Sequence, residues 1–163
     1  MNLRQIVHKD QLKLKEVYFD SINSIDESIY SRTQKFAWSS QAWENSEFDK
    51  SLLNGRGWSL CSDEKILGFG IRYPANRLSL LYVRGNLTRK GYGAIILNSI
   101  EREAFKEGIK ILKTEASLIS YKLLLKRNWE INIKEKVIIK GLIFERYKMF
   151  KNLEKYNLNN DQE

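Results

Sequence analysis

The spacing of apolar residues along the chain predicts where its helices lie. Apolar side chains that recur every three or four residues form one face of a helix. In the first such segment Leu14, Val17 and Tyr18 share a face. Helices are therefore predicted over residues 11–23, 31–38, 43–55, 94–104 and 117–128.

Polar residues and glycines mark the ends of several of these helices. Asp10 directly precedes the first helix and is suited to cap it. Ser31 and Gln34 have the spacing of a capping box, which predicts the start of the second helix. Gly55 and Gly108 are placed to end the third and fourth helices.

Alternation of apolar and polar residues predicts the strands. This period of two is the pattern of a pleated strand with one buried face. The segment 78–84 is nearly all apolar, which predicts a central strand buried on both sides. Strands are predicted over residues 3–7, 57–62, 66–73, 78–84, 109–116, 129–139 and 142–150.

The order of these elements predicts an α+β fold with a mixed sheet. Residues 57–84 form an antiparallel meander of three strands, and residues 129–150 form a hairpin around Lys140 and Gly141. The strand at 78–84, the helix that follows and the strand at 109–116 make a βαβ unit, so those two strands should run parallel. One domain is predicted over residues 1–151, followed by a polar tail at 152–163 that is expected to fray.

Composition narrows the class of protein. The chain has 163 residues, a formal net charge of +8, one cysteine and one histidine. An intramolecular disulfide is therefore impossible, and no spacing of a zinc site occurs. Because the start lacks the apolar core of a signal peptide and no apolar run could span a bilayer, we expect a cytoplasmic protein. The positive charge favours an anionic partner, although lysines spread over a solvated surface explain it equally well.

Two glycines at the start of the fourth predicted helix point to a diphosphate ligand. Gly91 and Gly93 follow Arg89 and Lys90, directly after an apolar strand. The first N–H groups of a helix are unpaired and attract anions, and glycines allow a diphosphate to approach the backbone. The Walker loop and the dinucleotide fingerprint do not fit, since their spacings require other residues here.

The loop and its neighbours resemble motif A of the GNAT superfamily, the acyl-CoA-dependent N-acetyltransferases. Its pattern [QR]-x-x-G-x-[GA] aligns with residues 88–93. The segments ILGFG, SIEREAFKEGIKILKTEAS, LLLKRNW and RYKMFK resemble further parts of the same family, in the same order. The resemblance implies a mostly antiparallel sheet of about seven strands flanked by about four helices.

The resemblance also implies the ligand and the reaction. The protein would bind acetyl-CoA and transfer its acetyl group directly to a primary amine, without a metal. Residues 81–83 would part from the next strand and pair with the pantetheine, and an N–H near Tyr82 or Val83 would polarise the thioester carbonyl. By resemblance the coenzyme A site consists of Leu81, Tyr82, Val83, Thr88, Arg89, Lys90, Gly91, Tyr92, Gly93 and Ala94.

The sequence departs from the family pattern at the proposed proton donor. Leu124 stands where the family commonly has a tyrosine that protonates the departing thiolate, and leucine cannot donate a proton. Tyr121, one helical turn earlier, is a candidate acid, with water as the other source; a half-buried packing role is the simpler interpretation of Tyr121. Thr88 replaces the usual Gln or Arg, and Asn128 replaces a glycine.

Candidates for the base and the acceptor pocket follow from position. Glu115, at the end of a predicted strand, is the candidate general base, and Ser79 and Glu27 are candidates for holding a water molecule. Tyr30 and Trp38 lie in the N-terminal helices that roof the acceptor site in this family, as does Trp43. Aromatic residues at this spacing are also typical of a core.

Three hypotheses remain open. The first is an acetyl-CoA-dependent N-acetyltransferase that acts on a small-molecule or peptide amine, as a monomer or a homodimer. The second is a non-catalytic acyl-CoA-binding domain, which Leu124 favours. The third, a nucleic-acid binder, ranks last because no array of aromatic and basic residues shares one sheet face. Nothing indicates a membrane partner.

Overall fold

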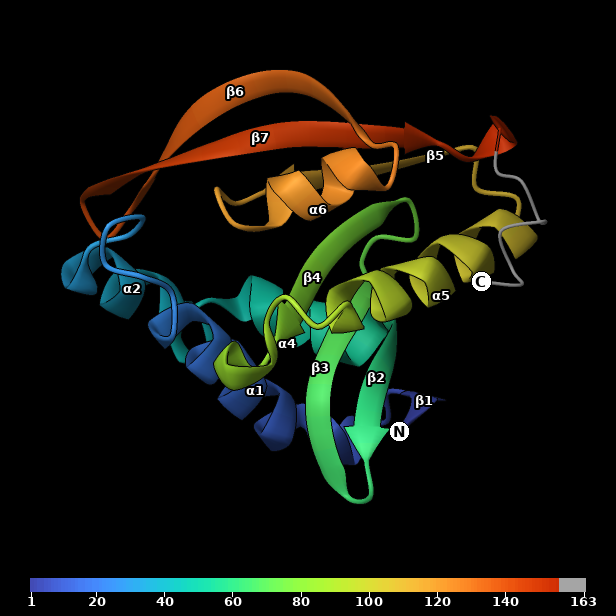
Figure 1. Cartoon of the computed structure of the whole chain (residues 1–163), viewed down its shortest axis with the longest axis horizontal. Coiled ribbons are helices and arrows are strands. Elements are labelled where there is room, and N and C mark those ends of the chain that lie inside the picture. The colour runs from blue at the N-terminus through green and yellow to red at the C-terminus, as the bar shows by residue number, and fades with distance from the viewer. Residues whose placement is uncertain (156–163) are drawn as a thin grey trace.

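A single seven-stranded sheet runs through the molecule (Figure 1). The computed structural model describes residues 1–155. The strands lie in the order β1-β2-β3-β4-β5-β7-β6, and every neighbouring pair is antiparallel except β4 and β5. Their bounds are β1 Asn2–Gln5, β2 Arg56–Ser62, β3 Lys65–Arg72, β4 Arg77–Val83, β5 Ile111–Ala116, β6 Glu130–Ile139 and β7 Leu142–Asn152.

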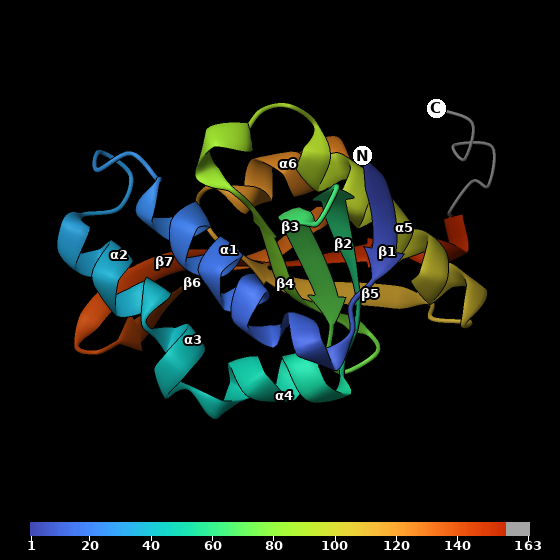
Figure 2. The same cartoon turned by 90° about the horizontal axis from the view of Figure 1, so that it is seen from below.

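Helices cover the sheet on two sides, each through its own apolar cluster. The helices are α1 Gln11–Asn23, α2 Arg32–Ser39, α3 Gln41–Glu44, α4 Ser46–Asn54, α5 Tyr92–Lys106 and α6 Ser120–Lys126. Helix α1 packs on β3 through a cluster that includes Leu14 and Phe69 (Figure 2). The other cluster joins α5 and α6 to the sheet through residues such as Ile96 and Leu124. The predicted α+β class and mixed sheet are confirmed.

Strands β4 and β5 run parallel, as the βαβ order predicts, but they stay together only briefly. Their register consists of Arg77 with Lys113 and Leu78 with Thr114. In Figure 1, β4 starts beside β5 and then runs away from it. Burial of the whole β4 strand was therefore the wrong expectation. Leu78 is buried at 3% exposure and the rest of the strand is half-buried, because its far edge has no neighbouring strand.

The predicted helix ends are partly right. The Ser31–Gln34 capping box is present, with both reciprocal hydrogen bonds at 2.9 and 3.1 Å. Asp10 does not cap α1: its carboxylate accepts from the Val7 N–H and from the Arg4 guanidinium, at 2.7–2.9 Å. The predicted helix at 43–55 is divided at Asn45, whose extended backbone and side-chain oxygen cap α4.

The predicted tail at 152–163 enters the fold before it ends. Asn152 belongs to β7, and Leu153 is fully buried with its N–H donating to the Lys110 carbonyl at 2.7 Å. The rest of that tail, from residue 156 on, lies outside the described residues. Within residues 1–155 no helix is long and apolar enough to cross a membrane, and no group of three or more potential ligands could hold a metal ion.

A buried ion pair joins α5 to the last strand. The Glu101 carboxylate, on α5, is 3% exposed; it accepts from the Trp129 indole N–H at 2.8 Å and from the Lys151 ammonium at 2.7 Å. Lys151 also donates to the Arg127 carbonyl at 2.9 Å. A buried charge that loses its partner is strongly destabilising, since its lost hydration is no longer compensated.

We expect Lys151→Met to lower the free energy of unfolding by about 3 kcal/mol, because Glu101 keeps its bond to Trp129 but loses its cation. The measurement is urea denaturation followed by circular dichroism. Lys50→Met is the matched control: it removes an exposed lysine paired with Glu47 at 3.1 Å and should change stability little. Equal midpoints for Lys151→Met and the unmodified protein would contradict the prediction.

Candidate active site

The start of α5 offers a row of free backbone amides. Gly91 is the N-cap residue and has a left-handed backbone, with φ of 82° and ψ of 4°. The first internal bond of the helix is donated by the Ile95 N–H to the Gly91 carbonyl, at 3.2 Å. Among the described residues, the N–H groups of residues 89–94 have no acceptor. An anion is the natural partner of such amides.

The side chains around these amides leave room for a ligand. A Cβ on Gly91 would meet nothing within 4 Å. Glycine is therefore favoured at this position by the positive φ and not by lack of space. At Gly93 the reason is close packing, because a Cβ there would lie 3.1 Å from the Leu123 side chain of α6. Arg89 and Lys90 are exposed, and neither has a carboxylate partner within residues 1–155. The loop therefore combines free donors with two free cations.

Helix α1 anchors the segment that leads into this loop. The Gly85 N–H donates to the Asp20 carboxylate at 2.9 Å, and the Thr88 hydroxyl donates to the Gly85 carbonyl at 3.1 Å. Thr88, predicted to contact the cofactor, thus uses its hydroxyl to shape the loop. Sequence reasoning missed Asp20, because nothing local in α1 signals a bond to a residue 65 positions later.

Beyond Leu78, the edge of β4 on the β5 side has no paired strand, and its backbone amides face the opening between the two strands. The Arg84 N–H donates to the Leu67 carbonyl of the β3 segment at 2.9 Å. Bonding residues alternate along an antiparallel strand, so the N–H of Tyr82 also faces β3. The N–H groups of Leu81 and Val83 face the side from which β5 has departed. Two residues were named as possible donors to the thioester carbonyl. The Val83 N–H points into the opening, whereas the Tyr82 N–H points toward β3.

Two side-chain bonds close the apex where β4 and β5 part. The buried Thr114 hydroxyl donates to the Leu78 carbonyl at 2.7 Å. The Arg77 guanidinium donates to Glu115 at 2.9 Å. Glu115, the candidate base, therefore lies at the parting of the strands with its carboxylate held by Arg77. Of the two candidates for holding water, Ser79 donates to the Ile71 carbonyl at 3.1 Å, and Glu27 is an exposed residue of the α1–α2 connection.

The two positions considered for the proton donor differ in burial. Leu124 is 1% exposed and belongs to the core cluster under α5. Tyr121 is half-buried, and its ring stacks on Tyr147 of β7, with centroids 4.5 Å apart and planes inclined by 32°. Among the described residues its hydroxyl has no hydrogen-bond partner. Tyr121 therefore packs against Tyr147, as the simpler interpretation expected, and also keeps a hydroxyl that is not engaged by another described residue.

An aromatic cluster lies on the α1 side of β4. Tyr30 and Phe144 are buried, and both rings contact Trp38, which also meets Tyr82 at 6.4 Å between centroids. The Tyr30 hydroxyl accepts from the Leu118 N–H at 2.9 Å. Burial raises the pKa of the Tyr30 and Tyr82 hydroxyls above the ordinary value, so both stay neutral at physiological pH.

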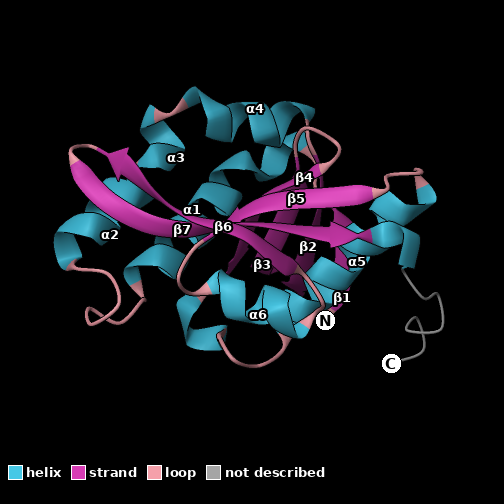
Figure 3. Ribbon diagram, turned by 90° about the horizontal axis from the view of Figure 1, so that it is seen from above, coloured by secondary structure: helices cyan, strands magenta, loops and turns pink. Residues whose placement is uncertain are grey.

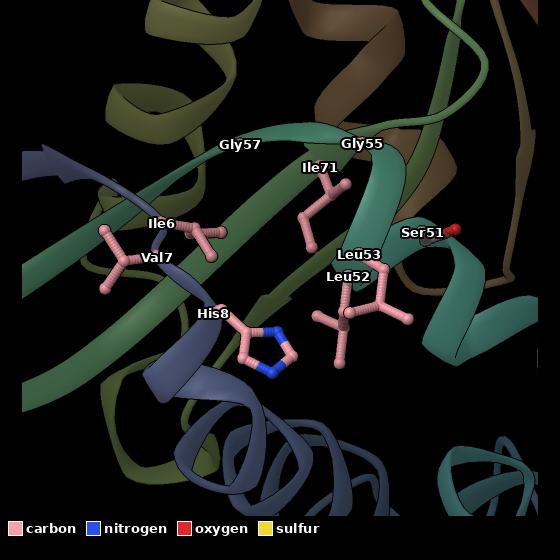
Figure 4. A pocket seen from close by; sticks show the side chains of 9 residues that line it. All are labelled: Ile6, Val7, His8, Ser51, Leu52, Leu53, Gly55, Gly57 and Ile71. Carbon is pink, nitrogen blue, oxygen red and sulfur yellow. The ribbon is translucent and has the colours of Figure 1, made fainter.

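Trp43 takes no part in this cluster. It is 51% exposed and contacts Phe19. A hollow of about 130 Å³ lies elsewhere, between the end of β1 and the end of α4 (Figure 4). His8 and Leu52 are among its lining residues, and it shares none with the predicted site. The residues of the sequence motif therefore lie at the α5 loop and the β4–β5 opening, and none of them lines this hollow.

Solved structures share this fold. A GCN5-related N-acetyltransferase from Rhodopseudomonas palustris superposes with a TM-score of 0.86 at 23% identity, covering 93% of this chain and 95% of that chain. The PaiA N-acetyltransferase from Thermoplasma acidophilum, solved with coenzyme A, superposes with a TM-score of 0.70 at 20% identity, covering 93% of this chain and 99% of that chain. The putative acetyltransferase yncA from Salmonella typhimurium, solved with acetyl-CoA, superposes with a TM-score of 0.67 at 15% identity, covering 96% of each chain.

Sequence comparison points to the same family. A search of curated proteins finds no match. The model of the acetyltransferase (GNAT) family, however, matches residues 19–127, which is more than half of the chain and includes the α5 loop, both strands of the opening and α6. This protein therefore belongs to the GNAT acetyltransferase family.

Proposed function

We propose that the protein transfers the acetyl group of acetyl-CoA to a primary amine by direct attack in a ternary complex. The observation that carries this proposal is the row of unpaired amides from Arg89 to Ala94, beside the opening between β4 and β5. The family match, and neighbours solved with coenzyme A and acetyl-CoA, support the choice of ligand.

The residues fit the parts of acetyl-CoA in a definite order. The amides of residues 89–94 hold the diphosphate, with Arg89 and Lys90 adding positive charge. The edge of β4 at Leu81 and Val83 pairs with the pantetheine amides, and the Val83 N–H donates to the thioester oxygen as negative charge develops there. Tyr82 contributes its ring to the acceptor side, next to Trp38 and Tyr30.

The reaction needs a neutral amine and a proton for the leaving group. The amine nitrogen attacks the thioester carbon, the carbon–sulfur bond breaks, and the thiolate takes one proton while the amine loses one. Tyr121 is the proposed donor, since its hydroxyl has no partner among the described residues. Glu115 is the proposed acceptor of the amine proton, acting directly or through water. The products are an N-acetylated amine and free coenzyme A.

One observation favours a second candidate function. Leu124 is sealed in the core, so the residue at the family's tyrosine position cannot reach a ligand. A non-catalytic acyl-CoA-binding domain would keep the amide row and have no need of an acid. A thermal shift with acetyl-CoA, followed by thiol release with a panel of amines, separates the two. Binding without turnover supports the second candidate, and no binding overturns both.

We expect Gly91→Ala to weaken acetyl-CoA binding about tenfold, because a Cβ at positive φ strains the backbone that aims the amides. Isothermal titration calorimetry measures the dissociation constant. Gly108→Ala is the matched control: Gly108 also has a φ of 82° and nothing within 4 Å, but it lies at the opposite end of α5. Equal loss of affinity in both variants would contradict the assignment of the loop.

If Tyr121 donates the proton, Tyr121→Phe should lower kcat by roughly 10²-fold or more while acetyl-CoA affinity is kept. Phenylalanine preserves the ring contact with Tyr147, so the loss would reflect the hydroxyl alone. Tyr147→Phe removes the other hydroxyl of the same ring pair and should leave kcat close to that of the unmodified protein. An unchanged kcat in Tyr121→Phe would assign the proton to water.

A further inference from the structure

A strip of alternating charges crosses four strands beside the proposed site. The Arg77 guanidinium of β4 donates to Glu115 of β5 at 2.9 Å, and Glu115 stands opposite Lys148 of β7. The Lys148 ammonium lies 3.7 Å from Glu135 of β6, and Glu135 stands opposite Arg146, which contacts it at 2.5 Å. We call these five residues the charged strip. Cross-strand partners share a sheet face, so the whole strip lies on one face.

That face is the one on the acceptor side of the sheet. Phe144 alternates with Arg146 and Lys148 along β7 and packs against Tyr30 and Trp38, with ring centroids 6.0 and 6.5 Å apart. The opposite face of β7 carries Tyr147, which α6 covers. In the view of Figure 3, no helix lies in front of β5 and β7. The five side chains of the charged strip are 24–49% exposed, so the strip is partly open to solvent, and through Phe144 it is continuous with the aromatic cluster.

Cations outnumber carboxylates on this partly open face. Lys113 lies two residues before Glu115 on β5, so it shares the face, and it is exposed. With Lys113, Arg77, Arg146 and Lys148 there are four cations against three carboxylates, because the exposed Glu130 of β6, opposite Phe150, shares this face with Glu115 and Glu135. Glu135 is shared by two of them, and Arg146 holds it more closely than Lys148 does. The Lys148 side chain is 49% exposed, more than those of Arg77 and Arg146, so it is the cation of the strip with most freedom to bind an anion.

The charge excess acts on an acceptor amine in two ways. An anionic group on the acceptor would gain a charge-assisted contact with Lys148, beside Arg146. The same positive field disfavours the ammonium form of a nearby amine, so it lowers the pKa of that amine and raises the neutral fraction that can attack. A plain alkylamine or polyamine would gain only the second effect and would meet repulsion as a cation.

We propose that the natural acceptor is a primary amine that also carries a carboxylate or phosphate group, which Lys148 binds with support from Arg146. The proposal rests on the transferase function argued above and specifies the acceptor class. Carboxylate and phosphate share the chemistry that Lys148 recognises, and the assay has one arm for each.

The test compares amines that differ only in the anionic group. Alkylamines are paired with ω-amino carboxylates of the same chain length, and ethanolamine is paired with phosphoethanolamine. We expect kcat/KM for the anionic member of at least one pair to be about tenfold higher, and this advantage to shrink as ionic strength rises. Whichever arm shows the advantage assigns the anion.

Variants on the two faces of the hairpin locate the effect. Lys148→Gln should remove most of the anionic advantage while leaving kcat/KM for the plain amine near its original value. Lys134→Gln is the control: Lys134 pairs with Glu145, opposite Tyr147, on the other face, and should keep the advantage. Circular dichroism melting confirms that both variants fold.

The outcomes distinguish this inference from the proposed function. Turnover of plain amines with equal or lower kcat/KM for their anionic partners overturns the inference alone. An advantage that survives in Lys148→Gln also overturns it, because another group would then bind the anion. Binding of acetyl-CoA without acetylation of any amine overturns the transferase function, and the inference falls with it.

Discussion

The structure depends on the early separation of two parallel strands. β4 and β5 share two register pairs and then diverge, with the apex closed by the Thr114 hydroxyl on the Leu78 carbonyl and by Arg77 on Glu115. A strand edge without a neighbour leaves amides that need partners. Because these amides lie next to those at the start of α5, one separation produces an extended row of donors that a molecule with amides and phosphates can satisfy.

Helix α5 must be held firmly for this row to keep its shape. Buried charges hold it at its middle and its end. The Arg72 guanidinium, fully buried in β3, lies 2.8 Å from both Glu103 and Glu107, and Glu101 is bound to Lys151 and Trp129. Ion pairs of this kind contribute little net stability but fix the position of an element, since any shift would leave a charge unpaired. The proposed phosphate site therefore lies on a rigid element, which limits the entropy lost on binding.

The two faces of the sheet have different chemistry. On the α5 face, aliphatic side chains form the larger core, and Leu124 completes it. On the α1 face, the aromatic cluster and the charged strip adjoin the opening between β4 and β5. The amine must enter from a side that core packing does not close, so this second face is where recognition of the acceptor is to be sought.

Much of the fold could be predicted because it follows from local periodicity. The parallel pairing of β4 and β5 followed from the βαβ order, and the capping box at Ser31 followed from two residues three positions apart. The predictions that were wrong share one cause, namely contacts with residues outside the local sequence pattern. Asp10 was predicted to cap α1, but Arg4 and the Val7 N–H bind its carboxylate. β4 was predicted to be buried on both sides because its apolar residues do not reveal that its neighbour departs.

The sequence alone determined the order of the main elements, the glycines at the start of α5 and the resemblance to the family, since each depends on residues that are close together in the chain. Tertiary structure decided which amides remain unpaired, that Val83 rather than Tyr82 turns its N–H to the opening, and that Glu115 is held by Arg77. It also decided that five charges from four strands form one strip. These features arise from strand register, which joins residues far apart in the chain and leaves no local signal.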